Sequence, residues 1–572
     1  MLFGVAALAA ACVPPKQPPP PPPLAFPCSA PSGPPVSGND PLRSGWYPDQ
    51  PGLNPSAGGT CAFGELWSAP VDGQVYAAPL IDPGAGAHGT LLVATETNHL
   101  YGIDGVSGTK LWERGDLGPP WNPNDLDCPN ITPSVGITST PAIDTATHTA
   151  YLVSKTYATD TSGPAQWKAH AIDLATGNEK PNFPVEIQGP ADNDPTVSFE
   201  PTHHLQRPGL LLMNGVVYAA FGSHCDVPDY RGWVVGISSA GQITARWTDE
   251  ALTDGNQNPA GGIWQSGGRL VSDQPGQMLL VSGNGIGPSA PTAGTTPPTM
   301  LGESAIRLKV QSGGTLQATD FWSPCNAQTL SNGDQDIGSG APLGLPDSFG
   351  TPAHPHLLMV VGKQGHIYLL DRDHLGGFQQ GPAGSCPDGS GNAGDDILDD
   401  VPAQDGIGIY ATPAMWPGDG GSIYLPYATL RNPGKLTSYR IIDNNGQPMF
   451  SLAGQSDGTL GYGSSSAIVT SDGETSGSAL VWIVFLPDSS GANTELRAYD
   501  PNPVGGLLQL RGSWPIGTGN KFTTPTVSAG RIYVGARDGN VHAFGVTNQS
   551  AQSNPPSRST TNAVPGIPDR EG

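Results

Sequence analysis

Four side chains that could bind a ligand occur at corresponding places in the sequence. They are Arg207 before a proline, Gln265 in IWQSGG, Tyr410 in IYATP and Lys521 before TTP. Each stands near the start of a strand-like repeat, and such starts open toward the central channel when repeats form a ring. Their guanidinium, amide, phenol and ammonium groups offer hydrogen bonds and charge. We therefore expect these four residues to line a ligand-binding site.

Motifs for several other chemistries are missing from the sequence. It contains no CxxC pair typical of structural zinc sites and no CxxCH haem-attachment motif. The net charge of −24 and the sparse, scattered Lys and Arg residues argue against nucleic acid, because such a chain repels polyanions. A neutral or cationic small molecule, or a protein partner, fits this charge better, and we expect a monomer.

A short start segment recurs eight times, and each copy leads into a β-branched run, a glycine turn and a second run. The copies lie roughly 50 to 80 residues apart, which suits one four-stranded propeller blade each. The start segments are Ala78-Pro79, Thr140-Pro141, Arg207-Pro208, Gln265-Ser266, Ala341-Pro342, Thr412-Pro413, Ser465-Ser466 and Thr524-Pro525. The sequence therefore predicts an all-β fold, an eight-bladed β-propeller of four-stranded antiparallel blades.

Composition agrees with this fold, because 79 Gly and 61 Pro in 572 residues interrupt the chain too often for long helices. The clearest repeat, TTPTVSAGRIYVGARDGNVHAFG at 523–545, places two alternating strands around an RDGN turn. No outer strand follows this last repeat, while Trp67 lies in a strand-like segment before the first. We expect residues around Glu65 to Val71 to supply the outermost strand of blade eight and close the ring.

Both ends of the chain differ in composition from the repeats. Residues 1–12 are mostly apolar or small and end in Cys12 after three alanines, which is typical of a signal segment with a lipoprotein-type cysteine. No Lys or Arg precedes the apolar stretch, so a true start upstream or a merely hydrophobic N-terminus are the alternatives. We expect a Pro-rich linker at 13–60, the propeller at 61–547 and a disordered tail at 548–572. The protein would then be exported, as a membrane-anchored lipoprotein or as an extracellular or periplasmic protein.

Six cysteines remain when Cys12 is set aside, an even number that suits an oxidising compartment and up to three disulfides. Fifteen pairings can be drawn. Proximity in sequence favours Cys28 with Cys61 and Cys325 with Cys386, and the remaining pair would be Cys128 with Cys225.

The repeats YGIDGVSGTKLW, HAIDLATGNEK and VHAFG resemble those of the pyrroloquinoline-quinone (PQQ) propellers, the quinoprotein alcohol dehydrogenase-like family. The similarity runs from about Gly64 to Val546. Four segments resemble more closely an exported, largely uncharacterised branch of this family: 207–238, 261–273, 282–285 and 361–377. The resemblance implies the fold but leaves the activity open, because this ring serves both dehydrogenases and non-catalytic assembly scaffolds.

For a dehydrogenase, the resemblance implies PQQ on the axis, a calcium ion, a carboxylate base and a cationic residue facing the quinone oxygens. Lys363 in GKQGHIYLLDR matches the cationic residue, and Asn284 in VSGNG matches a metal ligand. Asp334 or Asp336, in NGDQDIGSGAP, lies where a base or metal-binding Asp is expected. Each residue also has a structural interpretation: Lys363 as an exposed turn residue, Asn284 as a positive-φ loop residue and Asp336 as a turn or cap residue.

The sequence also departs from the dehydrogenase pattern. It has no two adjacent cysteines to cover the quinone, and the metal-binding Glu has no clear counterpart. Without a haem motif, electrons would leave through a partner. Two functions are therefore expected. The missing cysteine pair favours a ligand- or protein-binding scaffold without cofactor, and the Lys, Asn and Asp matches favour a PQQ- and calcium-dependent alcohol or sugar dehydrogenase.

Overall fold

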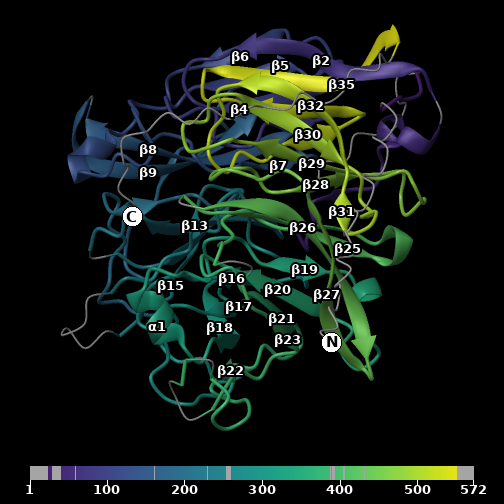
Figure 1. Cartoon of the computed structure of the whole chain (residues 1–572). Helices are drawn as coiled ribbons and strands as arrows, with labels where there is room; N and C mark the ends of the chain where they lie inside the picture. The colour runs from purple at the N-terminus through teal and green to yellow at the C-terminus, as the bar shows by residue number, and fades with distance from the viewer. Residues whose placement is uncertain are drawn as a thin grey trace, which may run out of the picture.

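Eight β-sheets surround a common axis, as the repeats predict (Figure 1). The structure is a computed structural model that describes residues 24–28, 40–57, 59–159, 161–228, 230–252, 259–386, 388–389, 393–403, 406–430 and 432–550. Its helices are short: α1 (Ala327–Asn332), η1 (Pro51–Leu53), η2 (Pro55–Ala57), η3 (Pro123–Leu126), η4 (Asp347–Phe349) and η5 (Gly418–Gly420). In the described part of the chain, no helix is long and apolar enough to cross a membrane. Cys12 and the rest of the predicted signal segment lie outside the described residues.

The three inner strands of blades one to four follow one another along the chain, the innermost first. Blade one contains β3 (Leu80–Asp82), β4 (Thr90–Ala94), β5 (Leu100–Asp104) and β6 (Lys110–Arg114). Blade two contains β7 (Ala142–Asp144), β8 (Thr149–Thr159), β9 (Ser162–Asp173) and β10 (Val185–Glu186). Blade three contains β12 (Leu211–Met213), β13 (Val216–Ser223), β14 (Trp233–Ser238) and β15 (Ile243–Thr248), with β11 (His204–Leu205) paired to β13. Blade four contains β16 (Gln277–Val281), β17 (Ala305–Val310), β18 (Leu316–Ser323) and β22 (Gly377–Phe378).

Blades five to eight complete the ring. Blade five contains β19 (Leu343–Leu345), β20 (Leu357–Val361), β21 (Ile367–Asp371) and β23 (Asp399–Val401). Blade six contains β24 (Ala414–Trp416), β25 (Ser422–Ala428), β26 (Pro433–Asn444), β27 (Gln447–Ser456) and β31 (Leu507–Leu508). Blade seven contains β1 (Trp46–Tyr47), β28 (Ile468–Thr470), β29 (Leu480–Phe485), β30 (Thr494–Tyr499) and β32 (Leu510–Gly517). Blade eight contains β33 (Thr526–Ser528), β34 (Arg531–Gly535), β35 (Asn540–Ser550) and β2 (Cys61–Pro70).

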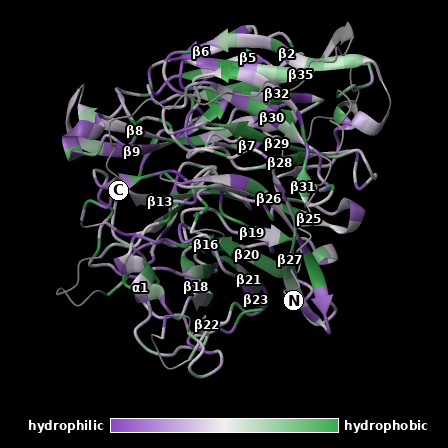
Figure 2. Ribbon diagram, in the orientation of Figure 1, coloured by the Kyte–Doolittle hydropathy of each residue, from purple (hydrophilic) through white to green (hydrophobic). Residues whose placement is uncertain are grey.

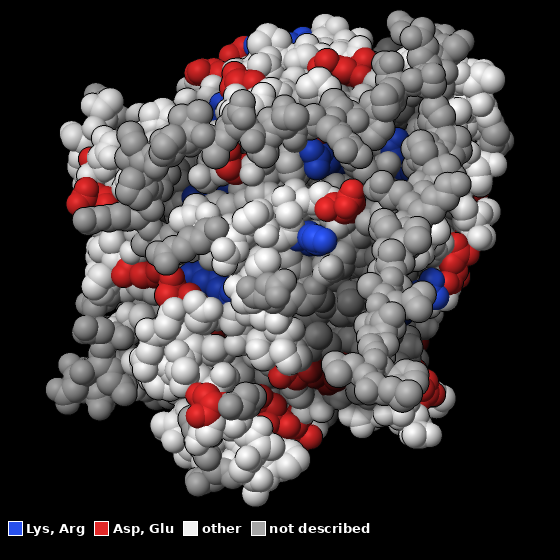
Figure 3. All heavy atoms as spheres, in the orientation of Figure 1, with Lys and Arg blue, Asp and Glu red and all other residues white. Residues whose placement is uncertain are grey.

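The middle strands of the blades are continuous apolar runs because neighbouring blades cover both of their faces. β20 has the sequence LLMVV and β29 has LVWIVF, and every residue in both is buried. Figure 2 shows the strands around β19 and β20 in green, the colour of hydrophobic residues. Figure 3 shows that the visible charged residues are scattered over a mostly uncharged surface, in line with the 13% content of charged residues.

Outer-strand tryptophans join one blade to the next. The indole of Trp67 lies on the turn of blade one at Gly108, where an added Cβ would come within 2.6 Å of the ring. Trp112 lies in the same way on Gly177 of blade two, and its Nε1 donates a hydrogen bond to Leu174 O at 2.9 Å. The repeated contact shows that these tryptophans mainly hold neighbouring blades together.

The ring closes as the sequence predicts. β2 pairs antiparallel with β35 and forms the outermost strand of blade eight, with Trp67 opposite Ala543. β35 extends to Ser550, past the predicted domain boundary at 547, and the chain beyond it lies outside the described residues. The three favoured disulfides are all present: Cys28–Cys61, Cys128–Cys225 and Cys325–Cys386.

Residues 40–54, here called the inner N-terminal segment, differ from the predicted linker at 13–60. The segment runs along the inner edges of blades four to eight. β1 pairs in parallel with β28, and Gly530 N donates to the side chain of Gln50 at 2.9 Å. Four carbonyls accept backbone hydrogen bonds of 2.8 to 3.2 Å: Pro41 from Ser272, Leu42 from Gly344, Ser44 from Met415 and Gly45 from Val469. A segment held through its backbone needs no side-chain pattern, so its sequence resembled a linker.

Candidate functional site

A cavity of about 320 Å³ lies where the start segments of the blades meet. Its lining includes five of the residues singled out in the sequence: Arg207, Asp336, Lys363, Tyr410 and Lys521. Smaller voids of about 20 and 70 Å³ continue along the axis, and the second is bounded by the inner N-terminal segment. The residues predicted to face the channel therefore do so, with one exception described below.

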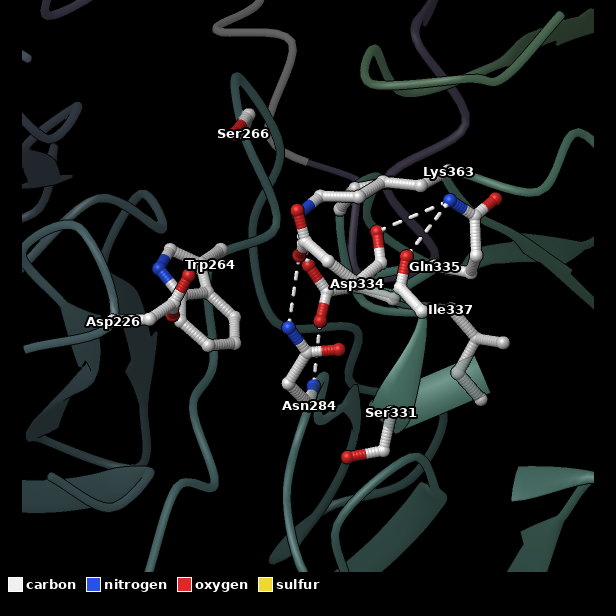
Figure 4. Close-up of polar contacts among 12 residues, drawn as sticks. Asp226, Trp264, Ser266, Asn284, Ser331, Asp334, Gln335, Ile337 and Lys363 are labelled. Carbon is white, nitrogen blue, oxygen red and sulfur yellow. Dashed lines mark hydrogen bonds and ion pairs between the residues drawn. The ribbon is translucent and has the colours of Figure 1, made fainter. Parts of the chain in front are cut away.

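The four residues matched through the family resemblance contact one another. Lys363 lies in the turn after β20, and its ammonium group contacts the carboxylates of Asp336, at 2.7 Å, and Asp334 (Figure 4). Asn284 donates from its backbone N–H to Asp336 at 2.5 Å and from its side-chain amide to Asp334 at 2.9 Å. Asp336 is buried and lines the cavity, whereas the side chain of Asp334 is 44% exposed. Asp336 is therefore the better placed of the two to meet a ligand.

The charges around Lys363 keep its ammonium group protonated. Burial opposes the charge of Lys363, but the carboxylates of Asp336 and Asp334 outweigh it and raise the pKa of this ammonium group. Asp226 also lines the cavity, and burial, reinforced by the charge of Asp336, raises its pKa. Two carboxylates face one ammonium group, and a third stands nearby, so the cluster favours an added cation.

One oxygen of the cluster has no partner. Asn284 is 8% exposed, and its buried Oδ1 accepts no hydrogen bond. A buried amide oxygen beside carboxylates is a suitable ligand for a hard cation. In the described chain, no three His, Cys, Asp or Glu side chains form a metal-binding group. A cation at Asn284 and Asp336 would therefore need further oxygens from a bound molecule or water.

Two buried glutamates hold the loop that carries Asn284. Glu303 donates its backbone N–H to Gly283 O at 2.8 Å, and its carboxyl accepts from Ile337 N at 2.9 Å. The carboxyl of Glu250 accepts from Ile286 N at 2.5 Å. Burial raises the pKa of Glu250 to about 8, with the neighbouring Asp249 adding to the effect, and burial and Asp336 raise that of Glu303. Both glutamates position the loop. In their protonated forms they add no negative charge to the cluster around Asp336.

Gln265 is the exception among the predicted cavity residues. Its side chain donates to Arg269 O at 3.0 Å and accepts from Val281 N at 3.2 Å, so it supports the start of blade four. Its neighbours Trp264 and Ser266 line the cavity instead. Gln265 has a φ of 39°, so the chain is not extended here, and its side chain leaves the cavity lining while those of Trp264 and Ser266 belong to it. The sequence pattern carried no signal for this local left-handed conformation.

Asp226 was not among the residues predicted to line the cavity, because it lies in a loop with no repeat pattern. It stands next to Cys225, whose disulfide to Cys128 ties this loop to the segment that contributes Pro129 and Asn130 to the cavity. The Asp226 carboxylate accepts from Tyr230 Oη at 2.7 Å. The disulfide thus fixes two parts of the cavity wall that are far apart in sequence.

Two residues of the cavity lining, Asp226 and Phe522, and three residues behind it adopt a left-handed backbone. Their φ angles are 48° for Asp226, 39° for Gln265, 48° for Glu303, 51° for Asp334 and 64° for Phe522. This conformation costs roughly 1–2 kcal/mol for a residue other than glycine, and such residues cluster at functional sites. The surrounding structure therefore holds this region in a conformation that its local sequence does not favour.

The fold is similar to solved structures of quinone enzymes. The quinohemoprotein alcohol dehydrogenase of Comamonas testosteroni superposes with a TM-score of 0.53 and 14% identity, over 92% of this chain and 83% of that one. The chain has the fold of these dehydrogenases. A quinohemoprotein alcohol dehydrogenase from Pseudomonas putida HK5 gives a TM-score of 0.52 and 12% identity, over 88% and 79% of the two chains. For a europium-containing methanol dehydrogenase the values are 0.50 and 11%, over 89% and 97%.

Sequence comparisons add nothing to this likeness. No protein-family model and no curated protein matches the chain. The likeness to the dehydrogenases is therefore one of fold, and the function has to be inferred from the residues of the cavity.

Proposed function

We propose that the protein is an alcohol or sugar dehydrogenase that uses PQQ and a divalent cation such as calcium. The observation that carries the proposal is the contact of Lys363 with Asp336, and of Asp336 with Asn284, inside the axial cavity. These residues come from blades four and five. The unpaired amide oxygen of Asn284 leaves this cluster with a ligand atom to offer.

The side chains present fit both groups. Trp264 offers an aromatic surface at the cavity, suited to a planar ring, and Lys363 offers a cation for ring oxygens. Asn284 Oδ1 and the carboxylates of Asp336 and Asp226 offer hard oxygen ligands. A volume of about 320 Å³ lies at the small end of the range for cofactor sites, about 300–1,000 Å³.

When bound, the quinone would supply a two-electron acceptor and the cation would polarise its carbonyl groups. Asp336 is the base in this proposal, and its carboxylate takes the proton of the substrate hydroxyl. Lys363 remains protonated because Asp336 and Asp334 stabilise its charge. Asp334, outside the cavity lining, acts as a positioning residue that keeps the ammonium group and the Asn284 amide in place.

Electrons would leave through a partner protein, since the sequence has no haem-attachment motif. Three disulfides suit an oxidising compartment. We place the protein outside the cytoplasm on this basis, with a lipid anchor at Cys12 as part of the proposal.

A binding scaffold is the second candidate. The absence of adjacent cysteines in the sequence favours it, because the disulfide that covers the quinone in related dehydrogenases then has no counterpart. The Cys128–Cys225 disulfide borders the same cavity, but it joins segments 97 residues apart.

The deciding experiment adds PQQ, with and without calcium, to the purified protein. We expect a stoichiometric quinone absorbance that needs calcium, and dye reduction with alcohols or sugars. N284A should weaken calcium-dependent binding by about 10- to 100-fold, as loss of a metal-site ligand does. N444A, an exposed asparagine on β26, is the matched control and should bind as the wild type does. Absence of quinone binding at micromolar concentration would refute the dehydrogenase and leave the scaffold.

A further inference from the structure

Arg207 places a positive charge in the cavity without a matching anion. Its Nη1 donates to Ser266 Oγ at 3.3 Å, while its Nη2 is buried and has no hydrogen-bond partner. Among the described residues, no ion pair includes Arg207. A buried guanidinium with an unused donor is costly unless an anion or other acceptor completes it. Ser266 lies apart from the Lys363 cluster in Figure 4, so this is a separate part of the cavity.

An aromatic group supports the guanidinium. The ring of Phe522 lies 5.5 Å from the Arg207 guanidinium carbon, and Tyr410 stacks on Phe522 with 5.9 Å between ring centroids and 9° between planes. Tyr462 meets both rings edge-on, at 5.3 and 5.6 Å. Phe522 has a φ of 64°, an unusual conformation for a bulky residue. The chain therefore accepts backbone strain to keep an aromatic ring beneath Arg207.

The nearest acidic influence on Arg207 does not neutralise it. Burial lowers the pKa of Arg207, and Tyr462, Tyr76 and Glu96 only partly oppose this shift. Oε2 of Glu96 accepts from Gly136 N, at 2.7 Å, and Thr138 Oγ1, at 3.1 Å, while Oε1 is buried without a partner. Burial raises the pKa of this carboxyl to about 7, and within the described residues no ion pair joins it to Arg207. The two tyrosines are neutral near pH 7. The charge of Arg207 is thus left for a molecule in the cavity to balance.

We propose that Arg207 and the aromatic group around Phe522 form a binding site for a carboxylate of a small molecule in the cavity. A guanidinium offers two parallel donors to a carboxylate, which a neutral hydroxyl cannot use equally well. The substrate class rests in addition on the proposed function: for a dehydrogenase, a carboxylate site at Arg207 makes a hydroxy acid or a sugar acid the substrate. The same chemistry would serve a carboxylate of the quinone itself, so the test must separate the two sources.

The test compares gluconate with sorbitol, which differs by one carboxylate, in calorimetric titrations of the full protein at equal chloride concentration. We expect gluconate to bind at least about tenfold more tightly than sorbitol, as expected when a charged hydrogen bond is gained. R207Q should lose about 10- to 100-fold in gluconate affinity. R207K keeps the positive charge but lacks the two parallel donors of the guanidinium, and it should lose less. K309Q removes an exposed lysine of β17 outside the cavity and should leave binding unchanged.

The titration is then repeated on protein loaded with PQQ and calcium. Gluconate binding that survives loading assigns the site to a substrate, and binding that PQQ abolishes assigns it to a cofactor carboxylate. Equal affinity for gluconate and sorbitol, or unchanged binding by folded R207Q, would overturn the proposal; the first comparison needs no variant. Gluconate binding in a protein that never takes up PQQ would keep the carboxylate site and reject the dehydrogenase.

Discussion

Two parts of the propeller axis are built differently. The inner N-terminal segment exchanges backbone hydrogen bonds with blade after blade, although Arg43 has a φ of 59° and Gln50 Nε2 is buried without a partner. At the cavity, the buried atoms without partners include Asn284 Oδ1 in the cluster around Asp336 and Arg207 Nη2 in the lining itself. The segment therefore serves mainly to hold the ring together, and the cavity keeps hydrogen-bonding capacity for a ligand.

The largest expected effect is the loss of dehydrogenase activity when Asp336 can no longer act as the base. D336N keeps the shape of the side chain but cannot accept a proton, so dye reduction should fall by about 10³-fold, within the range of about 10²–10⁴ for a general base. The thermal unfolding midpoint should also fall, because the buried Lys363 loses one of its carboxylate partners, so turnover is compared per folded molecule. D457N, at an exposed position away from the cavity, is the control. If D336N retains wild-type turnover, the base lies elsewhere.

The second expected effect is a loss of stability when the packing of the inner N-terminal segment is disturbed. Gly45 has a φ of 67°, and an added Cβ would lie 2.8 Å from Ala414 Cβ. G45A should therefore cost about 2–4 kcal/mol of stability, from backbone strain and overpacking together. Denaturant unfolding measures this loss, while turnover per folded molecule should be preserved.

A matched glycine separates these two contributions. Gly446 has a φ of 94° and no atom within 4 Å of an added Cβ, so G446A carries only the backbone strain. Equal destabilisation by G45A and G446A would show that the inner N-terminal segment is not tightly packed.

A further expected effect is a dependence of stability on pH. Glu250 has a pKa of about 8 in the folded protein, against about 4.3 when unfolded. A raised pKa stabilises the fold at low pH, and this contribution is lost as the pH rises through about 8. Wild-type stability should thus fall between pH 5 and pH 8, and E250Q should reduce the slope; Asp249, with a pKa of about 7, keeps part of it. An unchanged slope in E250Q would contradict the assignment.

Much of the fold could be predicted because it repeats. The eight start segments predicted the number of blades. The missing outer strand of the last repeat predicted that the strand with Trp67 closes the ring. Arg207, Tyr410 and Lys521 were found for the same reason, since each occupies a corresponding place in its repeat.

Features that do not repeat escaped prediction. Asp226 lies in a loop, and the inner N-terminal segment is held through backbone atoms that every residue shares. Gln265 was chosen in place of Trp264 because the local pattern does not show that Gln265 has a left-handed backbone and hydrogen-bonds to Arg269 O. The contact between Lys363, Asp336 and Asn284 depends on how blades four and five meet, and local sequence does not encode that distance.

The inner N-terminal segment also bears on the walls of the cavity. The void of about 70 Å³ that it borders shares Thr140, Gly267 and Thr524 with the narrow void of about 20 Å³. Arg207 and Lys521 in turn line both this narrow void and the main cavity. The part of the axis that holds the ring together and the part that would hold a ligand therefore have walls in common, so a change in one can reach the other through residues that belong to both.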